Sequence, residues 1–353
     1  MIKKIVISDS EKYLQIWGIR IPYYTERSAS ECKIIFGHLS FTYFHDELDG
    51  TCYIKIFGKP VHFRRNRRQR HYQLRDSLTD EKCRKILESE LPKLIGYSPN
   101  LKNPRSFNEK INWLKLNYHD PLVTQCCDKY SVKQYAANRI GDKYVLPVLG
   151  AWDEAADIDF SALPESFVIK VNWSSGFNII VRNKGELDER IARERIAAWM
   201  KKSSNSYYDL FNWGYKDMRP IIYAEPYIEQ IDNQLYDYKF FFNYGTFLYM
   251  FIATDRYKNG VTYTFFGDNF KPLPFTYGHK PNASPLPSMP NNLYKMLEFG
   301  SKLAKPFPFV RVDFYEINSE QFYLGEMTFY SGGGSLKFDP IEWDYELGEK
   351  IKL

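Results

Sequence analysis

Apolar and polar residues alternate in short runs over the first 75 positions of the chain. The runs CKIIFGHLSFTYF at 32–44 and CYIKIFG at 52–58 have the two-residue period of β-strands. Glycine and aspartate residues stand between such runs, as is typical of turns. The pattern predicts a small β-rich unit over residues 1–75, which ends in a strongly basic segment.

The period becomes helical after this unit. Apolar residues spaced three or four positions apart between 107 and 118 fall on one helical face, behind a capping box of Ser106 and Glu109. Asp128 is placed to cap a further helix, which Gly141 would end. We therefore expect this part of the chain to be mainly helical.

The remainder of the chain mixes strands with two helices. Two apolar strands flank a small polar loop in FVIKVNWSSGFNIIV at 167–181, and helices are expected at 187–202 and 292–304. A last pair of apolar strands covers 309–317 and 321–330. Strands and helices in this order predict an α+β fold of packed layers rather than a doubly wound parallel sheet.

The composition is that of a globular protein. Of the 353 residues, 44% are apolar and 17% aromatic, and glycine and proline show no period that would indicate a fibrous chain. Five cysteines without a CxxC pair argue against a disulfide framework or a structural zinc site. We expect a soluble protein of the reducing cytoplasm, because no apolar run approaches the ~20 residues of a membrane span and no signal peptide is recognisable.

The formal net charge of +5 is concentrated in one segment. Eight lysine and arginine residues lie within 55–75 without an acidic residue among them, which leaves the rest of the chain at −3. This distribution argues against a nucleic-acid-binding body. The segment has two interpretations: a peripheral contact with anionic membrane lipids, or a solvated linker after the β-rich unit.

The last strand pair carries a candidate metal site. A tight turn centred between residues 319 and 320 would place Asp313 opposite Glu326 and Arg311 opposite Thr328, all on one face. Opposed carboxylates repel each other unless a cation lies between them, and Mg²⁺ favours such oxygen ligands. The alternative is a solvated hairpin face on which the two acids pair with Arg311 or with a lysine.

The strand at 167–171 and the loop after it are candidates for binding phosphate. Alternation places Lys170 on the opposite face from three apolar residues, and the turn of Ser174, Ser175 and Gly176 offers backbone N–H groups to a close anion. The sequence contains neither a Walker A motif nor a Rossmann glycine fingerprint. The alternative is an ordinary hairpin with an exposed lysine.

A third candidate lies between residues 223 and 239. Pro226 interrupts the hydrogen bonding of a strand and leaves backbone donors and acceptors that an adenine edge could use. Asp237 could accept hydrogen bonds from ribose hydroxyls, and alternation places Lys239 on the same face. The alternative is an edge strand with a simple Asp–Lys pair.

Taken together, the candidate motifs follow a distinctive order. They are a DK pair at 128–129, a strand lysine with a small-residue hairpin at 170–178, EPYI at 225–228, an acid at 237, and D-x12-E from 313 to 326. This order resembles the ATP-grasp superfamily, in which two α+β lobes clamp ATP. The stretches NPRSFNEKINWLKL, DKYSVKQYAANRIGDKYVLPVLG, LPESFVIKVNWSSG, DYKFFFNYG and VRVDFYEIN resemble more specifically the TupA-like branch, which is associated with teichuronopeptide and bacterial surface-polysaccharide biosynthesis.

The similarity covers roughly residues 95–350 and implies a division of the chain. It implies a helical part of the catalytic region at 76–150, a nucleotide-clamping subdomain at 151–230, and a C-terminal subdomain with the metal and acceptor sites at 231–353. Residues 1–75 do not match the core ATP-grasp pattern, and we assign them no catalytic part.

The resemblance also implies how ATP would be bound. Lysines and the small loop would contact the phosphates, Glu225 and the backbone after it would hold the adenine, and Asp237 would hold the ribose. The residues that would bind ATP are Lys129, Lys170, Ser174, Ser175, Gly176, Glu225, Tyr227, Ile228, Asp237 and Lys239. Trp173 and Phe177 make the phosphate loop bulkier than a glycine-rich one, so we expect its closure to differ.

On the metal side, the resemblance assigns Mg²⁺ to Asp313, Glu326 and Thr328. Thr328 stands where many members of the superfamily carry a metal-binding asparagine, which weakens one coordination position. Arg311 would act with Lys170 as a catalytic cation that stabilises an acyl-phosphate and the developing oxyanion. Residues 332–335 would line the acceptor side.

The activity implied by the resemblance is ATP-dependent carboxylate–amine ligation through an acyl-phosphate. The implied substrates are a uronic-acid carboxylate of a surface glycan and an amino acid or other amine, with ATP and Mg²⁺ as cofactors and no nucleic acid. The alternatives are an ATP-dependent kinase of a glycan hydroxyl and a nonenzymatic glycan-assembly or membrane-associated factor with a degenerate nucleotide fold. The protein would lie in the cytoplasm, where residues 55–75 could contact the inner face of the membrane.

Overall fold

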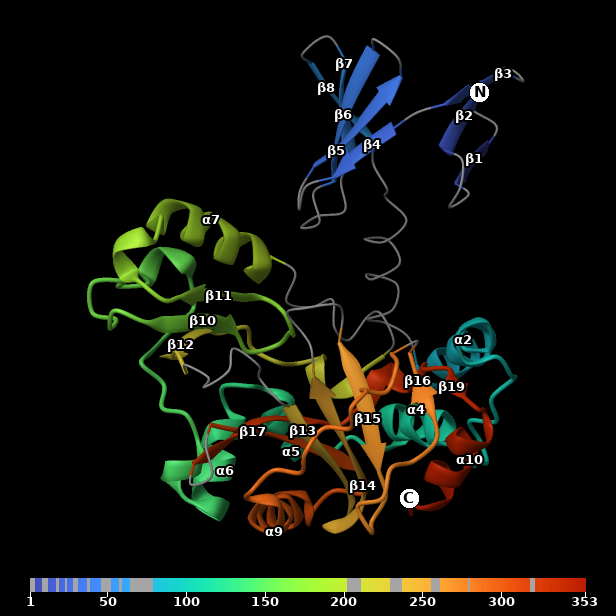
Figure 1. Ribbon diagram of the computed structural model, residues 1–353, viewed down its shortest axis with the longest axis vertical. Coiled ribbons are helices and arrows are strands. Elements are labelled where there is room, and N and C mark those ends of the chain that lie inside the picture. The colour runs from blue at the N-terminus through green and yellow to red at the C-terminus, as the bar shows by residue number, and fades with distance from the viewer. Residues whose placement is uncertain are drawn as a thin grey trace. The chain divides into compact units, whose positions relative to one another are not determined.

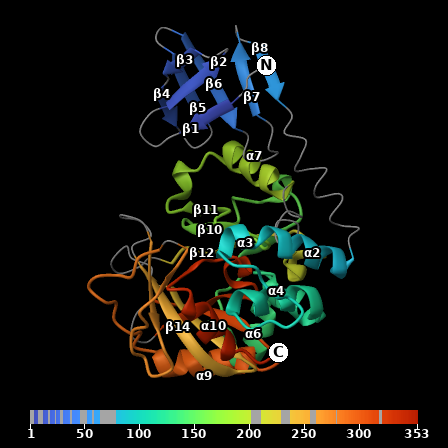
Figure 2. The same cartoon turned by 90° about the vertical axis from the view of Figure 1, so that its right-hand side faces the viewer.

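The computed structural model divides the chain into two compact units, Met1–Leu74 and Arg75–Leu353. In the second unit it describes residues 79–201, 211–228, 237–254, 261–278, 280–317 and 321–353, and in the first the backbone of strands between residues 4 and 63. Figure 1 and Figure 2 show the chain in two views. The side chains discussed below all belong to the second unit.

The strands of the first unit form two antiparallel sheets, each in sequential order. The three-stranded sheet contains β1 (Lys4–Ile7), β2 (Lys12–Ile16) and β3 (Ile19–Pro22). The five-stranded sheet contains β4 (Tyr24–Arg27), β5 (Glu31–Phe36), β6 (Leu39–His45), β7 (Cys52–Ile56) and β8 (Lys59–Phe63). The alternating runs at 32–44 and 52–58 lie largely in β5, β6 and β7, as their period predicts. The side chains of the basic segment at 55–75, on which the membrane and linker interpretations depend, lie outside the described part of the chain.

Helices open the described part of the second unit. They are α2 (Asp80–Glu90), α3 (Pro92–Ile95), α4 (Phe107–Asn117), α5 (Pro121–Cys127) and α6 (Val132–Ile140). The predicted capping box of α4 is confirmed, because Ser106 Oγ accepts from the Glu109 N–H at 3.1 Å and Glu109 Oε2 accepts from the Ser106 N–H at 3.0 Å. Gly141 ends α6 with a φ of 95°, a conformation that favours glycine.

A four-stranded antiparallel sheet follows, in the order β11-β10-β12-β9. Its strands are β9 (Gly150–Trp152), β10 (Phe167–Val171), β11 (Asn178–Val181) and β12 (Ile222–Pro226). Phe167, Ile169 and Val171 are buried on one face of β10, which leaves Lys170 on the other face as alternation predicts. Helix α7 (Glu189–Met200) lies along this sheet in Figure 1.

A five-stranded antiparallel sheet forms the centre of the second unit, in the order β15-β14-β13-β17-β18. Its strands are β13 (Asp237–Asn243), β14 (Thr246–Thr254), β15 (Thr262–Phe266), β17 (Val310–Glu316) and β18 (Phe322–Thr328). Aromatic side chains such as Phe240, Phe251 and Phe265 are fully buried in it. Helix α9 (Leu293–Ala304) packs against β13, β14 and β17, and it closes the lower face of the sheet in Figure 1.

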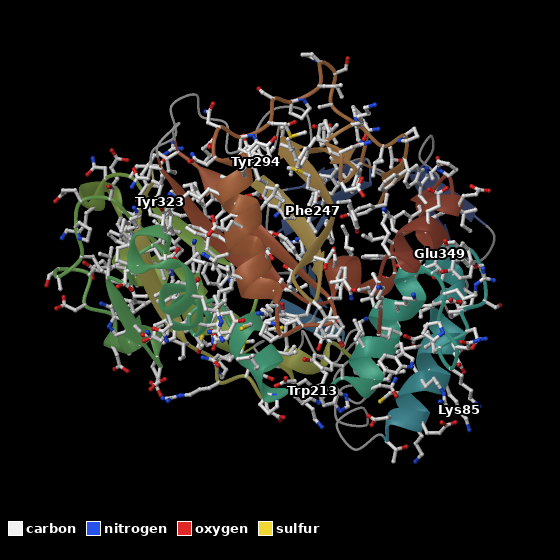
Figure 3. The ribbon with its side chains drawn as sticks, turned by 90° about the horizontal axis from the view of Figure 1, so that it is seen from below. Lys85, Trp213, Phe247, Tyr294, Tyr323 and Glu349 are labelled. Carbon is white, nitrogen blue, oxygen red and sulfur yellow. The ribbon has the colours of Figure 1, made fainter. Side chains whose placement is uncertain are left out.

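Short elements complete the unit. Strands β16 (Thr276–Tyr277) and β19 (Phe338–Asp339) pair with each other, and α10 (Glu342–Glu349) packs on α4. In Figure 3, α10 with its labelled Glu349 lies beside the helices of the first part of the unit. The 3-10 helices are η1 (Asp142–Tyr144), η2 (Ala155–Asp157), η3 (Lys184–Glu186), η4 (Trp213–Tyr215) and η5 (Ser331–Gly334).

The register of β17 and β18 confirms the pairs that the sequence predicts. Arg311 pairs with Thr328, and Asp313 pairs with Glu326. The centre of the turn, at 318–320, lies outside the described residues. The hairpin therefore brings two acids and one arginine to one place on the sheet.

A β-bulge at Gly325 modifies this hairpin. Asp313 pairs with Glu326, but the next residue of β17 pairs with Leu324, so Gly325 is the extra residue. A Cβ atom at Gly325 would lie 2.7 Å from the ring of Tyr315. The close approach of this ring therefore requires a glycine at the bulge.

Helices and antiparallel sheets in packed layers make the second unit an α+β structure, as predicted. Among the described residues, every helix is too short or too polar to cross a membrane. The described cysteines, Cys83, Cys126 and Cys127, are buried and form no disulfide.

Candidate functional site

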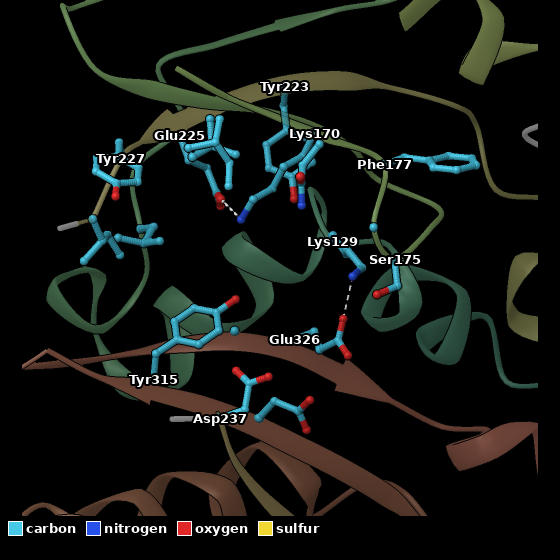
Figure 4. A pocket seen from close by; sticks show the side chains of 18 of the residues that line it. Lys129, Lys170, Ser175, Phe177, Tyr223, Glu225, Tyr227, Asp237, Tyr315 and Glu326 are labelled. Carbon is cyan, nitrogen blue, oxygen red and sulfur yellow. Dashed lines mark hydrogen bonds and ion pairs between the residues drawn. The ribbon is translucent and has the colours of Figure 1, made fainter. Parts of the chain in front are cut away.

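A cavity of about 570 Å³ lies between the four-stranded and the five-stranded sheet. Strands β10 and β12 and the loop at 174–178 form one wall, and β13, β17 and β18 form the other. Figure 4 shows Lys170 and Glu225 on the first wall and Asp237 and Glu326 on the second. The residues predicted from the sequence to bind ATP all line this cavity, together with Asp313 and Glu326, whereas Arg311, Thr328 and residues 332–335 do not.

Asp313 and Glu326 share the guanidinium group of Arg311. Arg311 donates to Asp313 through Nε at 2.6 Å and Nη2 at 2.7 Å, and Nη2 also donates to Glu326 at 3.0 Å and to Thr328 Oγ1 at 3.0 Å. Burial lowers the pKa of Arg311, but Asp313 and Glu326 raise it above its ordinary value. Asp313 is 1% exposed, whereas Arg311, Glu326 and Thr328 are half-buried. The face is therefore not fully solvated, and its acids pair with Arg311 and with lysines, as the alternative interpretation expects.

Two lysines add to the positive charge around these acids. Lys239 contacts Asp313, and its Nζ lies 3.4 Å from Asp237 Oδ2. Lys129 Nζ lies 2.5 Å from Glu326 Oε2. Burial raises the pKa of Glu326, but the surrounding cations, Lys129 first among them, hold it well below its ordinary value. Glu326 is therefore an ionised carboxylate, with its side chain half-buried at the cavity wall.

Glu225 is enclosed by two lysines at the end of β12. Its carboxylate forms ion pairs with Lys170 and Lys133. Burial raises the pKa of Glu225, but the two ammonium groups lower it below its ordinary value. Lys133 also donates to the carbonyl oxygen of Leu146 at 2.8 Å. The sequence reasoning missed Lys133, which lies in the first turn of α6, and no local signal in the sequence distinguishes it from a solvent-exposed helical lysine.

The turn that carries Lys129 is fixed to the end of β10. Asp128 Oδ1 accepts from the N–H groups of Tyr130 at 2.8 Å and Ser131 at 3.1 Å, so the predicted cap acts in the turn before α6. Asp128 Oδ2 accepts from Asn172 Nδ2 at 2.9 Å, and the Lys129 N–H donates to the Asn172 carbonyl oxygen at 3.1 Å. These bonds place the Lys129 side chain at the cavity.

The loop after β10 is anchored by its aromatic residues. Phe177 stacks on Trp199 of α7, with ring centroids 5.4 Å apart and an interplanar angle of 8°, and Trp173 meets Phe177 edge-on at 5.3 Å. Gly176 has a φ of 83°, which explains the glycine in the turn. Phe177 therefore attaches the loop to α7 and also lines the cavity, together with the small residues of the loop.

The wall beyond Glu225 has an apolar surface. Val168 and Ile180 line it together with Tyr227 and Ile228. The hydroxyl of Tyr227 accepts from Arg182 Nε at 3.0 Å. The connection at 229–236 lies outside the described residues. An apolar wall next to an exposed backbone suits a flat ring with polar edges.

The glycine-rich segment at 332–335 lies on the far side of Arg311 and does not line the cavity. It overlaps η5, which begins at Ser331, three residues after the end of β18. Arg311 Nη1 donates to Ser331 Oγ at 3.4 Å. Arg311 therefore connects this segment to the two acids.

Asp313 and Glu326 have the donor chemistry for a Mg²⁺ ion that is bound together with phosphate, but each of their oxygens accepts from Arg311, Lys129 or Lys239, and such an ion would have to displace these cations. Within the described ranges, no group of three or more His, Cys, Asp or Glu residues could hold a metal ion. Mg²⁺ in nucleotide sites usually takes one or two carboxylates and completes its shell with phosphate oxygens and water. Asp313 and Glu326 supply two carboxylates at one wall of the cavity.

Comparison with known families identifies the chain. A family model described as TupA-like ATPgrasp matches residues 109–352. The chain belongs to the TupA-like ATP-grasp family. The α+β ATP-grasp fold expected from the sequence is thereby confirmed. No curated protein sequence matches the chain.

Several solved enzyme structures resemble part of this ATP-grasp chain. D-alanine-D-alanine ligase from Helicobacter pylori is 19% identical, with 65% of this chain and 61% of that chain covered and a TM-score of 0.35. The Bacillus anthracis D-alanine–D-alanine ligase complexed with ATP is 15% identical, with 57% of this chain and 54% of that chain covered and a TM-score of 0.34. Biotin carboxylase from Campylobacter jejuni is 17% identical, with 65% of this chain and 47% of that chain covered and a TM-score of 0.36. The chain thus spans about half to three-fifths of the length of these proteins.

Proposed function

We propose that the protein is an ATP- and Mg²⁺-dependent carboxylate–amine ligase. The observation that carries the proposal is the meeting of lysines and opposed carboxylates in one cavity of an ATP-grasp chain. Lys129, Lys170 and Lys239 would neutralise ATP phosphates, because each ammonium group lies at the cavity wall. Asp313 and Glu326 would hold Mg²⁺, which supplies charge neutralisation between phosphate groups when bound.

The proposed reaction has two steps. An oxygen of the substrate carboxylate attacks the γ-phosphorus of ATP, and the bond from that phosphorus to the ADP oxygen breaks. The amine then attacks the carbonyl carbon of the acyl-phosphate, loses a proton, and releases inorganic phosphate as the amide forms. Positioning and charge neutralisation dominate such phosphoryl chemistry, so no strong general base is required for the first step.

The side chains would divide this work between them. Lys170 is held by Glu225 beside the loop at 174–178 and would contact the transferred phosphoryl group. Arg311 lies behind the two acids, between Asp313 and Ser331. From there it would orient the acids and stabilise negative charge that develops on the acceptor side. Tyr227, Ile228 and the apolar wall would hold the adenine, and Asp237 would hold the ribose.

The substrates are proposed from the resemblance to the TupA-like branch. A uronic-acid carboxylate of a bacterial surface glycan would be the acid, and an amino acid or other amine would be the nucleophile. The protein would act in the cytoplasm, where glycan precursors are assembled. A peripheral contact through residues 55–75 would bring it to an anionic membrane surface.

Replacement of Glu326 by glutamine tests the proposal. We expect Glu326→Gln to lower ADP release by about 100-fold or more, because the amide removes one of the two charged metal ligands. ADP release is measured with Mg-ATP and a panel of uronic-acid glycans and amino acids. Glu194→Gln is the control, since Glu194 is exposed on α7 and pairs only with Arg190 among the described residues. Near-normal turnover of Glu326→Gln would contradict the metal assignment.

Hydroxylamine separates the ligase from a glycan kinase. A ligase forms an acyl-phosphate, which hydroxylamine converts to a hydroxamate, whereas a phosphorylated hydroxyl does not react in this way. Phosphate transfer to the glycan without hydroxamate would favour the kinase. A calorimetric titration that detects no Mg-ATP binding would favour the nonenzymatic factor.

A further inference from the structure

Three consecutive glycines give η5 a left-handed backbone. Gly332, Gly333 and Gly334 have φ values of 58°, 64° and 58°. A Cβ atom at Gly334 would lie 2.6 Å from Asn112 Nδ2, so the segment also approaches α4 closely. Glycine loses more conformational freedom on ordering than any other residue. Specific contacts are therefore needed to hold this segment in one conformation.

These contacts come from α4 on one side and from Arg311 on the other. Lys115 Nζ donates to the Gly333 carbonyl oxygen at 2.6 Å, and Asn112 Nδ2 donates to the Gly334 carbonyl oxygen at 2.7 Å. At the start of the segment, Arg311 Nη1 donates to Ser331 Oγ at 3.4 Å. The segment is therefore held between a helix and the arginine that pairs with both acids.

The buried side chain of Lys115 is expected to lower the stability of the fold. Its side chain is 2% exposed, and among the described residues its ammonium group has only neutral partners, the Gly333 carbonyl oxygen and Asn112 Oδ1 at 3.0 Å. Burial lowers the pKa of Lys115 to about 7. An ammonium group buried without a carboxylate generally destabilises a protein, and an apolar side chain of similar volume is often better tolerated. A lysine at this position is therefore better explained by its hydrogen bond to the glycine segment than by the stability of the whole fold.

We propose that Lys115 is a positioning residue that fixes Ser331–Gly334 beside Arg311. When Lys115 is protonated, its bond to Gly333 is charge-assisted and therefore stronger than a bond between neutral groups. The link from this segment to catalysis rests on the proposed function, because Arg311 and the acceptor side matter only if the reaction occurs. The ordering of the segment does not depend on that function.

The same helix offers a matched control. Lys110 also lies on α4 and donates to a backbone carbonyl oxygen, that of Ile351, at 2.6 Å. Its partner lies at the C-terminal end of the chain rather than in η5. Lys110→Met therefore removes the same kind of bond from the same helix without touching the glycine segment.

Hydrogen–deuterium exchange of the full chain, followed by mass spectrometry, tests the proposal. In Lys115→Met we expect the amides of peptides covering 329–337 to exchange about tenfold faster, because one charge-assisted hydrogen bond is lost. The informative amides are those of Gly333 and Ser335, which donate to Tyr330 and Gly332. Lys110→Met should leave these peptides unchanged.

The melting temperature distinguishes positioning from support of the whole fold. We expect Lys115→Met to melt at the same temperature as the wild type or higher, since it removes a buried charge. A variant that fails to fold, or melts lower, would assign Lys115 to global stability and overturn the proposal. Unchanged exchange at 329–337 would overturn it as well.

Kinetics connect the result to the proposed reaction. In Lys115→Met the KM for the acceptor should rise several-fold while calorimetric affinity for Mg-ADP stays at the wild-type value. An equal loss of Mg-ADP affinity would show that Lys115 supports the nucleotide cavity instead. If the wild type releases no ADP with any substrate pair, the proposed function fails, whereas the exchange result still decides the role of Lys115.

Discussion

Each oxygen of the Glu225 carboxylate is engaged by a different lysine, Oε1 by Lys133 and Oε2 by Lys170. A carboxylate bonded in this way holds lysines in place and has little capacity left for an adenine edge. Lys133 does not line the cavity, yet it shares Glu225 with Lys170, which does. Lys133 therefore acts on the cavity through Glu225.

Replacement of Lys133 by methionine tests whether Lys133 affects the cavity through Glu225 and Lys170. Lys170 would then neutralise Glu225 alone and would be less available to phosphate, so we expect the affinity for Mg²⁺ and a nonhydrolysable ATP analogue to fall about tenfold. Isothermal titration calorimetry measures the affinity. Lys184→Met is the control, because Lys184 donates to the carbonyl oxygens of Ser161 and Leu163 away from the cavity. Equal affinities of the two variants would argue against this role of Lys133.

Glu326 gives the protein a specific dependence on pH. Its pKa in the folded chain lies well below the ordinary value of 4.5. Above pH 4.5 the group is ionised in both the folded and the unfolded chain, and its full contribution to stability is present. As the pH falls from 4.5 towards the folded pKa, the unfolded chain takes up a proton first and this contribution is lost.

Urea unfolding of the wild type and Glu326→Gln at a series of pH values measures this contribution. We expect the difference in unfolding free energy between the two proteins to be constant from pH 7 to about pH 5. Below pH 4.5 the difference should shrink. A difference that stays constant into the acid range would mean that the surrounding cations do not hold the pKa of Glu326 down.

At the scale of elements, the β17–β18 hairpin shows what a sequence can and cannot predict. Strand alternation and an assumed turn place Asp313 opposite Glu326, which is correct. Nearer the turn the prediction is wrong by one residue. The assumed turn would pair Tyr315 with Leu324, but Tyr315 pairs with Tyr323. The bulge at Gly325 adds one residue to β18, and this restores the predicted register at Asp313 and Glu326. Its position depends on the packing of a tyrosine ring against Gly325, which the hydrophobic pattern does not encode.

Replacement of Gly325 by alanine tests the importance of the bulge. The added Cβ would meet the ring of Tyr315, which lines the cavity, so we expect a loss of about 1–3 kcal/mol in unfolding free energy and weaker nucleotide binding. Chemical denaturation and calorimetry give the two quantities. Gly185→Ala is the control, because its Cβ would meet only Asn183 Oδ1, at 3.3 Å. A stability loss no larger than that of the control would show that the ring moves aside freely.

At the scale of the whole molecule, all the residues that line the cavity lie within Arg75–Leu353. We therefore expect a fragment of residues 75–353 to fold and to bind Mg-ATP as tightly as the full chain. Circular dichroism and calorimetry on both proteins check this. A fragment that folds but binds much more weakly would assign part of the nucleotide site to Met1–Leu74.

The order of motifs along the chain is sufficient to predict the ATP-grasp fold and half of the residues that line the cavity. Lys129 and Glu326 are far apart in sequence but form an ion pair. The family pattern predicts that they lie close together, which local periodicity alone does not. Lys133 and Lys115 escaped the sequence reasoning, because a lysine on a helix usually lies in solvent. Their burial depends on tertiary contacts with Glu225 and Gly333.

The stacking of Phe177 on Trp199 has a practical consequence for the study of this protein. The emission of an indole depends on the groups that touch its ring, and here one of those groups belongs to the loop at 174–178. Any movement of that loop towards a ligand would change the contact between the two rings. Among the seven tryptophans of the chain, Trp199 would therefore be the intrinsic fluorophore that responds to a movement of this loop in stopped-flow experiments without a label.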